Sequence, residues 1–147
     1  MAMMEEPASA PLIRDATAGE IAGFQAEEWA RYDEEVGVRW DSRRYQLAAE
    51  LDGKLVGIAV YHIVGGVGHL DQLLVAKDYR GRGIGSQLLA EFERRCRAAG
   101  CHKLTLETAG YQAQARRLYE EHGFKVACTL RDNKFHRDWY LMEKALD

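Results

Sequence analysis

The sequence predicts a mixed α/β domain whose sheet contains both antiparallel and parallel strands. Two observations indicate this fold class. In the first half, three apolar runs are separated by Asp52-Gly53 and Gly65-Gly66, turn pairs that are typical of antiparallel hairpins. In the second half, a strand, an amphipathic helix and another strand follow one another around Gly85. That order implies a parallel pair of strands.

The bulk composition fits a single ordinary globular domain. Of the 147 residues, 47% are hydrophobic and 29% are charged, and the net charge is -3. The lack of a basic excess argues against nucleic acid as the main partner, and no apolar run is long enough to span a membrane. Residues 1–10 are acidic, carry no secretory signal and are expected to form a flexible tail, followed by one domain over residues 11–147.

The cysteines and histidines indicate neither a disulfide framework nor a metal site. Cys96, Cys101 and Cys128 form no even set and no C-x-x-C pair, so we expect reduced thiols and a cytoplasmic location. The five histidines are scattered and show no zinc-binding spacing. No bound metal is therefore predicted.

The first half of the chain is predicted to run from a strand through a helix into a meander. Residues 12–17 read as a short strand, and Thr17 with Glu20 forms a capping box that starts a helix. Residues 33–44 are polar and irregular, a loop or a short second helix. The strands of the meander are then expected at residues 45–51, 54–64 and 68–75.

The second half alternates between helices and strands. Apolar residues mark one face of a helix from Ile84 to a C-terminal cap at Gly100. A short helix over residues 112–122 is stopped by Gly123. Strands are expected at residues 102–108, 124–131 and 138–146. The last strand is apolar on both faces, which would permit a homodimer.

The stretch YRGRGIGSQLL, residues 79–89, places three glycines and two arginines at the start of a helix. A helix start exposes unpaired N–H groups and the positive end of the helix dipole, and glycines let a ligand approach the backbone, so this loop suits a phosphate. Arg80 and Arg82 would add positive charge. The glycine spacing fits neither the dinucleotide fingerprint nor the P-loop, which disfavours an NAD-dependent oxidoreductase. The alternative is that the glycines merely turn the chain.

Two motifs together resemble the GNAT acetyltransferases. The spacing Arg80-x-x-Gly83-x-Gly85 is similar to the acyl-CoA loop of that family, and ARRLYEEHGF, residues 115–124, resembles its signature A-x-x-L-Y-x-x-x-G-F. The resemblance covers about residues 12–145. It implies the GNAT fold: a mostly antiparallel sheet of six to seven strands, about four flanking helices and a parallel pair at the acyl-CoA cleft. It also implies acetyl-CoA as co-substrate.

The resemblance further implies roles for individual residues. The loop backbone would hold the pyrophosphate of coenzyme A, the end of the fourth strand would pair with the pantetheine arm, and Tyr119 would protonate the departing thiolate. Gln112 stands where the family commonly has Asn and would offer its amide to the pantetheine. The residues expected to bind coenzyme A are Leu74, Val75, Arg80, Gly81, Arg82, Gly83, Ile84, Gly85, Ser86 and Gln112.

The expected reaction also needs a base, because an aliphatic amine with a pKa of about 10.4 is mostly protonated at pH 7. Glu107, at the end of its strand, and Asp71, in the middle of the fourth strand, are the candidates. Each is alternatively an ordinary surface carboxylate. The predicted function is transfer of acetyl from acetyl-CoA to a primary amine of a small molecule or peptide, by direct attack in a ternary complex. The alternative is a sensor that binds acyl-CoA without turnover; the presence of Tyr119 favours the enzyme.

Overall fold

The computed structural model describes residues 9–147, and the chain divides into two compact units, Met1–Arg39 and Trp40–Asp147. The first unit contains helix α1 (Ala18–Val36). The Thr17 hydroxyl accepts a hydrogen bond from the Glu20 N–H at 3.3 Å, and the Glu20 carboxylate accepts one from the Thr17 N–H at 3.2 Å. The predicted capping box is therefore confirmed.

The strand predicted over residues 12–17 is wrong. These residues form neither helix nor strand, and all six strands of the described chain lie between Arg43 and Ala145. A strand needs a neighbour that shares its ladder of hydrogen bonds, and this segment has none. The described residues hold three α-helices rather than about four, with two short 3₁₀ turns, Lys77–Tyr79 and Lys134–His136. No helix within residues 9–147 has the length and apolar character needed to cross a membrane.

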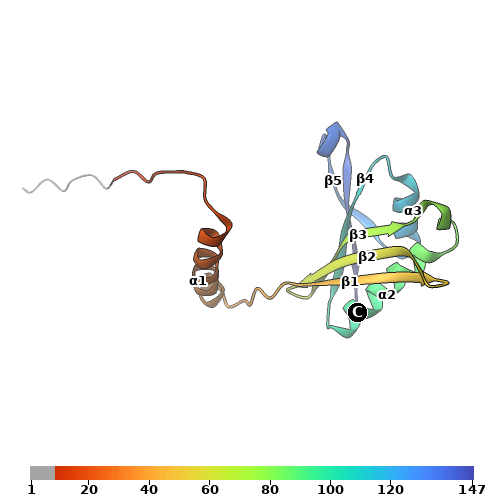
Figure 1. Cartoon of the computed structure of the whole chain (residues 1–147), viewed down its shortest axis with the longest axis horizontal. Coiled ribbons are helices and arrows are strands. Elements are labelled where there is room, and N and C mark those ends of the chain that lie inside the picture. Colours follow the sequence, from red (N-terminus) through yellow and green to blue (C-terminus); the bar gives the residue numbers. More distant parts are fainter. Residues whose placement is uncertain (1–8) are drawn as a thin grey trace, which may run out of the picture. The chain divides into compact units, whose positions relative to one another are not determined.

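The second unit is built on a six-stranded sheet with the strand order β1-β2-β3-β4-β6-β5 (Figure 1). Neighbouring strands are antiparallel except β3 and β4, which run parallel. The predicted mixed sheet with one parallel pair is thus confirmed. The strands are β1 (Arg43–Leu51), β2 (Lys54–Val64), β3 (Val67–Val75), β4 (Lys103–Ala109), β5 (Lys125–Leu130) and β6 (Trp139–Ala145).

Helix α2 (Ile84–Ala98) covers one face of β1, β2 and β3, and α3 (Ala113–Glu121) packs against β4. The buried side of α2 consists of Leu88, Leu89, Phe92 and Cys96, as its sequence periodicity predicts. In the sheet beneath it, the Tyr61 ring meets the Phe92 ring edge-on at 5.0 Å between centroids. The start of α2 lies over the first residues of β2, since a Cβ at Gly57 would be 3.2 Å from the Ile84 side chain, and Gly57 pairs with Val75 at the end of β3.

Position 68 on β3 has no room for a side chain, because α2 lies directly above Gly68. A Cβ at this position would lie 2.5 Å from the Cys96 Sγ and 3.1 Å from the Leu104 Cδ2, and Cys96 is fully buried. We expect Gly68→Ala to lower the free energy of unfolding by about 1–3 kcal/mol in urea denaturation, because overpacking forces the core to shift. The loss of unfolding free energy caused by Gly68→Ala should be smaller in a Cys96→Ala background, where the sulfur is absent. Equal losses from Gly68→Ala in both backgrounds would contradict this explanation.

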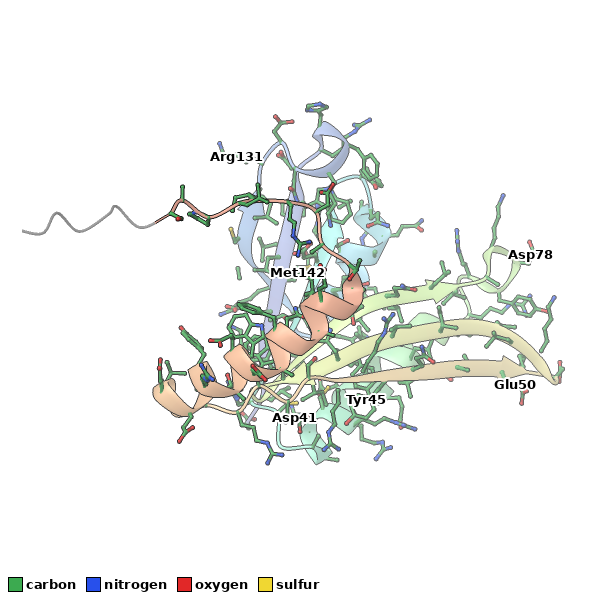
Figure 2. All side chains as sticks on the ribbon, turned by 60° about the vertical axis from the view of Figure 1, so that its left-hand side comes forward. Asp41, Tyr45, Glu50, Asp78, Arg131 and Met142 are labelled. Carbon is green, nitrogen blue, oxygen red and sulfur yellow. The ribbon has the colours of Figure 1, made fainter. Side chains whose placement is uncertain are left out.

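The last strand, β6, lies inside the sheet between β4 and β5. Its Met142 pairs with Leu106 on one side and Val126 on the other, and Met142 is fully buried (labelled in Figure 2). Neighbours on both sides satisfy the hydrogen bonds along the two edges of a strand, whereas its two faces are buried only by elements that pack above and below the sheet. The inner position therefore does not account for the apolar pattern, and the homodimer stays a prediction.

Candidate active site

Strands β3 and β4 are paired over only half their length. The parallel ladder runs from Val67↔Lys103 to Leu70↔Leu106, yet β3 continues to Val75 and β4 to Ala109. The separation begins at Asp71, where a bulge in β3 shifts its register with β2. Bulges bend a strand and end its pairing. As a result, the side of β3 that faces β4 has no strand partner beyond Leu70.

A glycine loop leads from β3 into α2. Gly81 has φ 76° and Gly83 has φ 80°, left-handed values that favour glycine, and open space surrounds the position of a Cβ at both. Gly83 is the N-cap of α2 and offers no side chain to the first turn. The N–H groups of Ile84, Gly85 and Ser86 lack intrahelical acceptors by position, so this end of the helix is suited to an anion.

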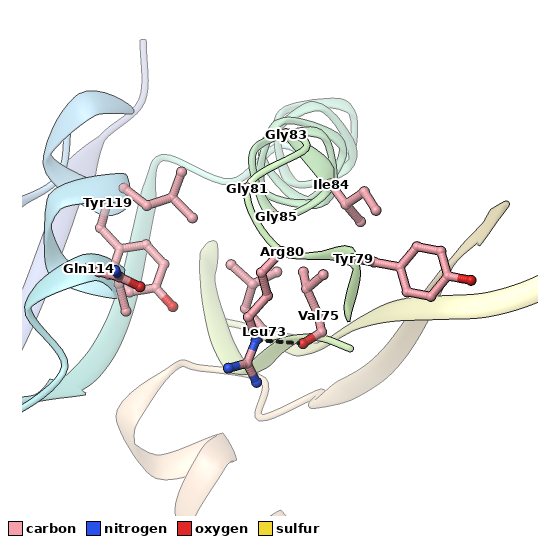
Figure 3. Close-up of a pocket in the computed structure, with 12 residues that line it drawn as sticks. Leu73, Val75, Tyr79, Arg80, Gly81, Gly83, Ile84, Gly85, Gln114 and Tyr119 are labelled. Carbon is pink, nitrogen blue, oxygen red and sulfur yellow. Dashed lines mark hydrogen bonds between the residues drawn. The ribbon is translucent and has the colours of Figure 1, made fainter. Parts of the chain in front are cut away.

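The loop borders a cavity of about 380 Å³, here called the loop cavity (Figure 3). Figure 3 places Tyr119 and Gln114 of α3 across this cavity from the glycines. Its lining residues are Leu73, Val75, Tyr79, Arg80, Gly81, Gly83, Ile84, Gly85, Gln114, Ala115, Leu118 and Tyr119.

The two arginines of the loop are held differently from each other. The Arg80 side chain lines the loop cavity, where its Nε donates to the Val75 carbonyl at 3.1 Å. The Arg82 guanidinium lies 5.0 Å from the centre of the Tyr79 ring and donates to the Asp78 carbonyl at 3.4 Å. Of the two, only Arg80 therefore faces the space where the glycines would receive a phosphate.

A second cavity of about 310 Å³, here called the carboxylate cavity, lies where β3 and β4 separate. It is lined by both predicted bases, Asp71 from β3 and Glu107 from β4. Tyr119 lines this cavity and the loop cavity alike, so it stands where the two spaces meet. The remaining lining residues are Leu70, Gln72, Leu73, Leu74, Thr108, Gln112, Ala115 and Trp139.

Tyr119 is 7% exposed, and its burial raises the pKa of the phenol above the ordinary tyrosine value. Burial disfavours the charged phenolate because the surroundings solvate it poorly. The side chain thus carries its proton throughout the neutral range. A group in this state can donate a proton and cannot serve as a base.

The side chains of the two carboxylates are 31% (Asp71) and 36% (Glu107) exposed, and they have different partners. Asp71 accepts from Nδ1 of His62 at 2.8 Å, whereas the nearest cation to Glu107 is the Lys134 ammonium at 4.0 Å. Glu107 is therefore the less engaged of the two. Among residues 9–147, no three His, Cys, Asp or Glu side chains lie close enough together to bind a metal ion.

The other predicted residues are placed as follows. Gln112 lines the carboxylate cavity, where its Oε1 accepts from the Ala109 N–H at 3.1 Å and its amide NH₂ is left for other contacts. Leu74 lines the same cavity. Arg82 and Ser86 line neither cavity, and the Ser86 hydroxyl is hydrogen-bonded to Nε2 of His122 at 2.7 Å.

Sequence reasoning missed several residues that line the two cavities. His62 lines neither cavity but contacts Asp71, and it was missed because that contact depends on the register between β2 and β3. Trp139 was missed because it is brought to the site by pairing with Ala109, which lies 30 residues earlier in the chain. Thr108 follows Glu107 directly, so adjacency to a predicted base was the one available signal.

Comparison with known proteins finds similar sequences and structures. Residues 10–124 match the acetyltransferase (GNAT) family. An IAA acetyltransferase of Azospirillum brasilense is 40% identical over 80 residues, which are 53% of this chain and 52% of the relative. An aminoalkylphosphonate N-acetyltransferase of Salmonella typhimurium is 34% identical over 87 residues, 55% of this chain and 56% of the relative. The chain thus spans about half the length of these curated relatives.

The likeness to solved structures extends over nearly the whole chain. An acetyltransferase from Bacillus cereus superposes with a TM-score of 0.79, covering 92% of this chain and 98% of that one at 24% identity. At this identity the comparison establishes the fold. Both the mixed sheet and its one parallel pair therefore have a counterpart of known structure.

Proposed function

The chain belongs to the GNAT family of acetyltransferases, and on that premise we propose that it transfers the acetyl group of acetyl-CoA to a primary amine. One observation carries the proposal: a buried, protonated Tyr119 lies where an open glycine loop and a cavity with two carboxylates meet. The loop is suited to a phosphate-bearing carrier and the carboxylates to an amine. Tyr119 would then stand beside the bond that breaks.

The glycine loop fits the diphosphate of coenzyme A. The N–H groups of Gly83, Gly85 and Ser86 would donate to its oxygens, and the absence of a Cβ at Gly83 leaves the room that close approach requires. Arg80 would add charge from the wall of the loop cavity. The unpaired side of β3 from Asp71 to Val75 would pair with the extended pantetheine arm as an added strand.

Bound acetyl-CoA would supply an acetyl thioester, which is reactive enough for an amine to attack directly. The chain would hold the two reactants together and manage two protons. Glu107 would take a proton from the ammonium form of the acceptor, directly or through water, and Tyr119 would give its proton to the departing sulfur. The N-acetyltransferase name of the Salmonella relative supports an amine as the acceptor.

The proposal is tested by release of free thiol from acetyl-CoA across a panel of amines, with mass analysis of the products. The panel should include amino acids, polyamines, aminoalkyl acids and peptides with free amino termini. An acceptor that gains the mass of one acetyl group, in step with thiol release, is the expected result. Binding of acetyl-CoA with no turnover across the panel would instead favour a sensor.

Replacement of Glu107 tests which carboxylate is the base. We expect Glu107→Gln to lower kcat/KM by about 100-fold at pH 6.5 and by much less near pH 9.5, where the free amine becomes abundant without help. Asp71→Asn is the matched control and should preserve the wild-type pH profile. If the two variants exchange these behaviours, Asp71 is the base; if Glu107→Gln keeps the wild-type profile, Glu107 has no such role.

A further inference from the structure

We propose that the hydroxyl of Thr108 donates a hydrogen bond to the carbonyl oxygen of the acyl thioester, an inference that rests on the proposed function. Thr108 is 2% exposed. Its Oγ1 is the only buried side-chain nitrogen or oxygen in residues 9–147 that lacks a hydrogen-bond partner. An unsatisfied buried hydroxyl is costly, and proteins seldom keep one without a use.

The position of Thr108 on β4 directs its side chain to the reacting end of the site. Side chains alternate along a strand, so Thr108 shares a face with the buried Leu104 and Leu106 and lies opposite Glu107. It lines the carboxylate cavity together with Tyr119 but does not line the loop cavity. A ligand that meets Thr108 therefore meets it near Tyr119 and away from the glycines.

Two hydrogen-bond acceptors that line the carboxylate cavity with Thr108 already have donors of their own. The Gln112 Oε1 accepts from the Ala109 N–H at 3.1 Å, and the Asp71 carboxylate accepts from His62 at 2.8 Å. Glu107 extends from the opposite face of β4. A threonine hydroxyl has one proton to donate, and an acyl carbonyl oxygen that enters the cavity would accept it.

The test compares Thr108→Val, which keeps the shape and removes the hydroxyl, with Thr108→Ser, which keeps the hydroxyl. Melting temperatures of the free proteins and dissociation constants for acetyl-CoA and desulfo-CoA are measured without an amine. We expect Thr108→Val to melt no lower than the wild type and to bind acetyl-CoA about five- to tenfold more weakly, the worth of one hydrogen bond. Desulfo-CoA, which lacks the thioester, should bind both proteins equally, and Thr108→Ser should retain the affinity for acetyl-CoA.

Thr105 provides a matched control on the same strand. Its Oγ1 is hydrogen-bonded to Nδ1 of His69 at 2.7 Å, on the face opposite Thr108. Thr105→Val should therefore lower the melting temperature and leave the affinity for acetyl-CoA unchanged. Thr108→Val is thus expected to lose affinity for acetyl-CoA without a lower melting temperature, whereas Thr105→Val is expected to melt lower without losing affinity.

Two other results would overturn the inference. If Thr108→Val destabilises the free protein as Thr105→Val does, or fails to fold, its hydroxyl has a structural partner such as a buried water. If Thr108→Val binds acetyl-CoA as tightly as the wild type does, the hydroxyl does not touch the thioester. Failure of the wild type itself to bind acetyl-CoA would instead refute the proposed function, and the inference with it.

Discussion

Tyr119→Phe is expected to lower kcat for amine acetylation by about 100-fold or more while leaving the affinity for acetyl-CoA within about twofold of the wild type. The substitution removes one hydroxyl from a buried ring and leaves the contact of that ring with Phe124 in place. Without the phenol proton, the thiolate must leave unaided or take its proton from water. Stopped assays of thiol release at saturating substrates measure kcat, and calorimetry measures binding.

Tyr45→Phe is the matched control for this experiment. Tyr45 lies on β1, stacks on Tyr61 at 5.1 Å and lines neither cavity of the site. Its variant should retain wild-type kcat. Because burial raises the pKa of Tyr119, the wild-type rate should not decline from loss of this proton until the pH passes the ordinary tyrosine value of about 10. Wild-type turnover by Tyr119→Phe would show that another group protonates the sulfur.

Gly83→Val is expected to abolish the stabilisation that acetyl-CoA gives the protein. At a ligand concentration 100 times the dissociation constant, binding stabilises the wild type by about 2.7 kcal/mol, which appears as a rise in melting temperature. The valine would strain a residue at φ 80° and fill the space over the α2 N-terminus that the diphosphate needs. The rise should therefore fall close to zero in this variant.

Gly53→Val is the matched control, because it introduces the same backbone strain as Gly83→Val at a position away from the diphosphate space. Gly53 has φ 76° in the turn between β1 and β2, and open space surrounds its Cβ position, as at Gly83. Both variants should lose about 1–3 kcal/mol of stability through backbone strain, yet only Gly53→Val should keep the full effect of acetyl-CoA. A full ligand effect in Gly83→Val would place the diphosphate elsewhere.

Local signals in the sequence were sufficient for most helix and strand assignments. The capping box at Thr17, the hairpin turn at Asp52-Gly53 and the helix start at Ile84 each depend on a few neighbouring residues, and the structure has all three. The exception is the strand predicted over residues 12–17. A strand requires a neighbouring strand as its partner, and a short stretch of sequence does not identify that partner.

The residues of the site that lie within short sequence motifs could be predicted. The glycine loop and Tyr119 lie in two short motifs, so their residues could be named in advance, and the structure places both on the loop cavity. The separation of β3 from β4 could not be foreseen, because it arises from a bulge at Asp71 and from the register of non-neighbouring segments. The same holds for the contact between Asp71 and His62 and for the unpartnered hydroxyl of Thr108.

The place of β6 between β4 and β5 has a consequence for biosynthesis. A ribosome delivers β5 before the strand that connects it to the rest of the sheet, so β5 has no neighbour until Trp139–Ala145 has emerged from the exit tunnel. During that interval the outer edge of β4 is uncovered as well. Until β6 has emerged, the nascent chain therefore exposes both edges of β5 and the outer edge of β4, the state in which chaperones and aggregation compete for it.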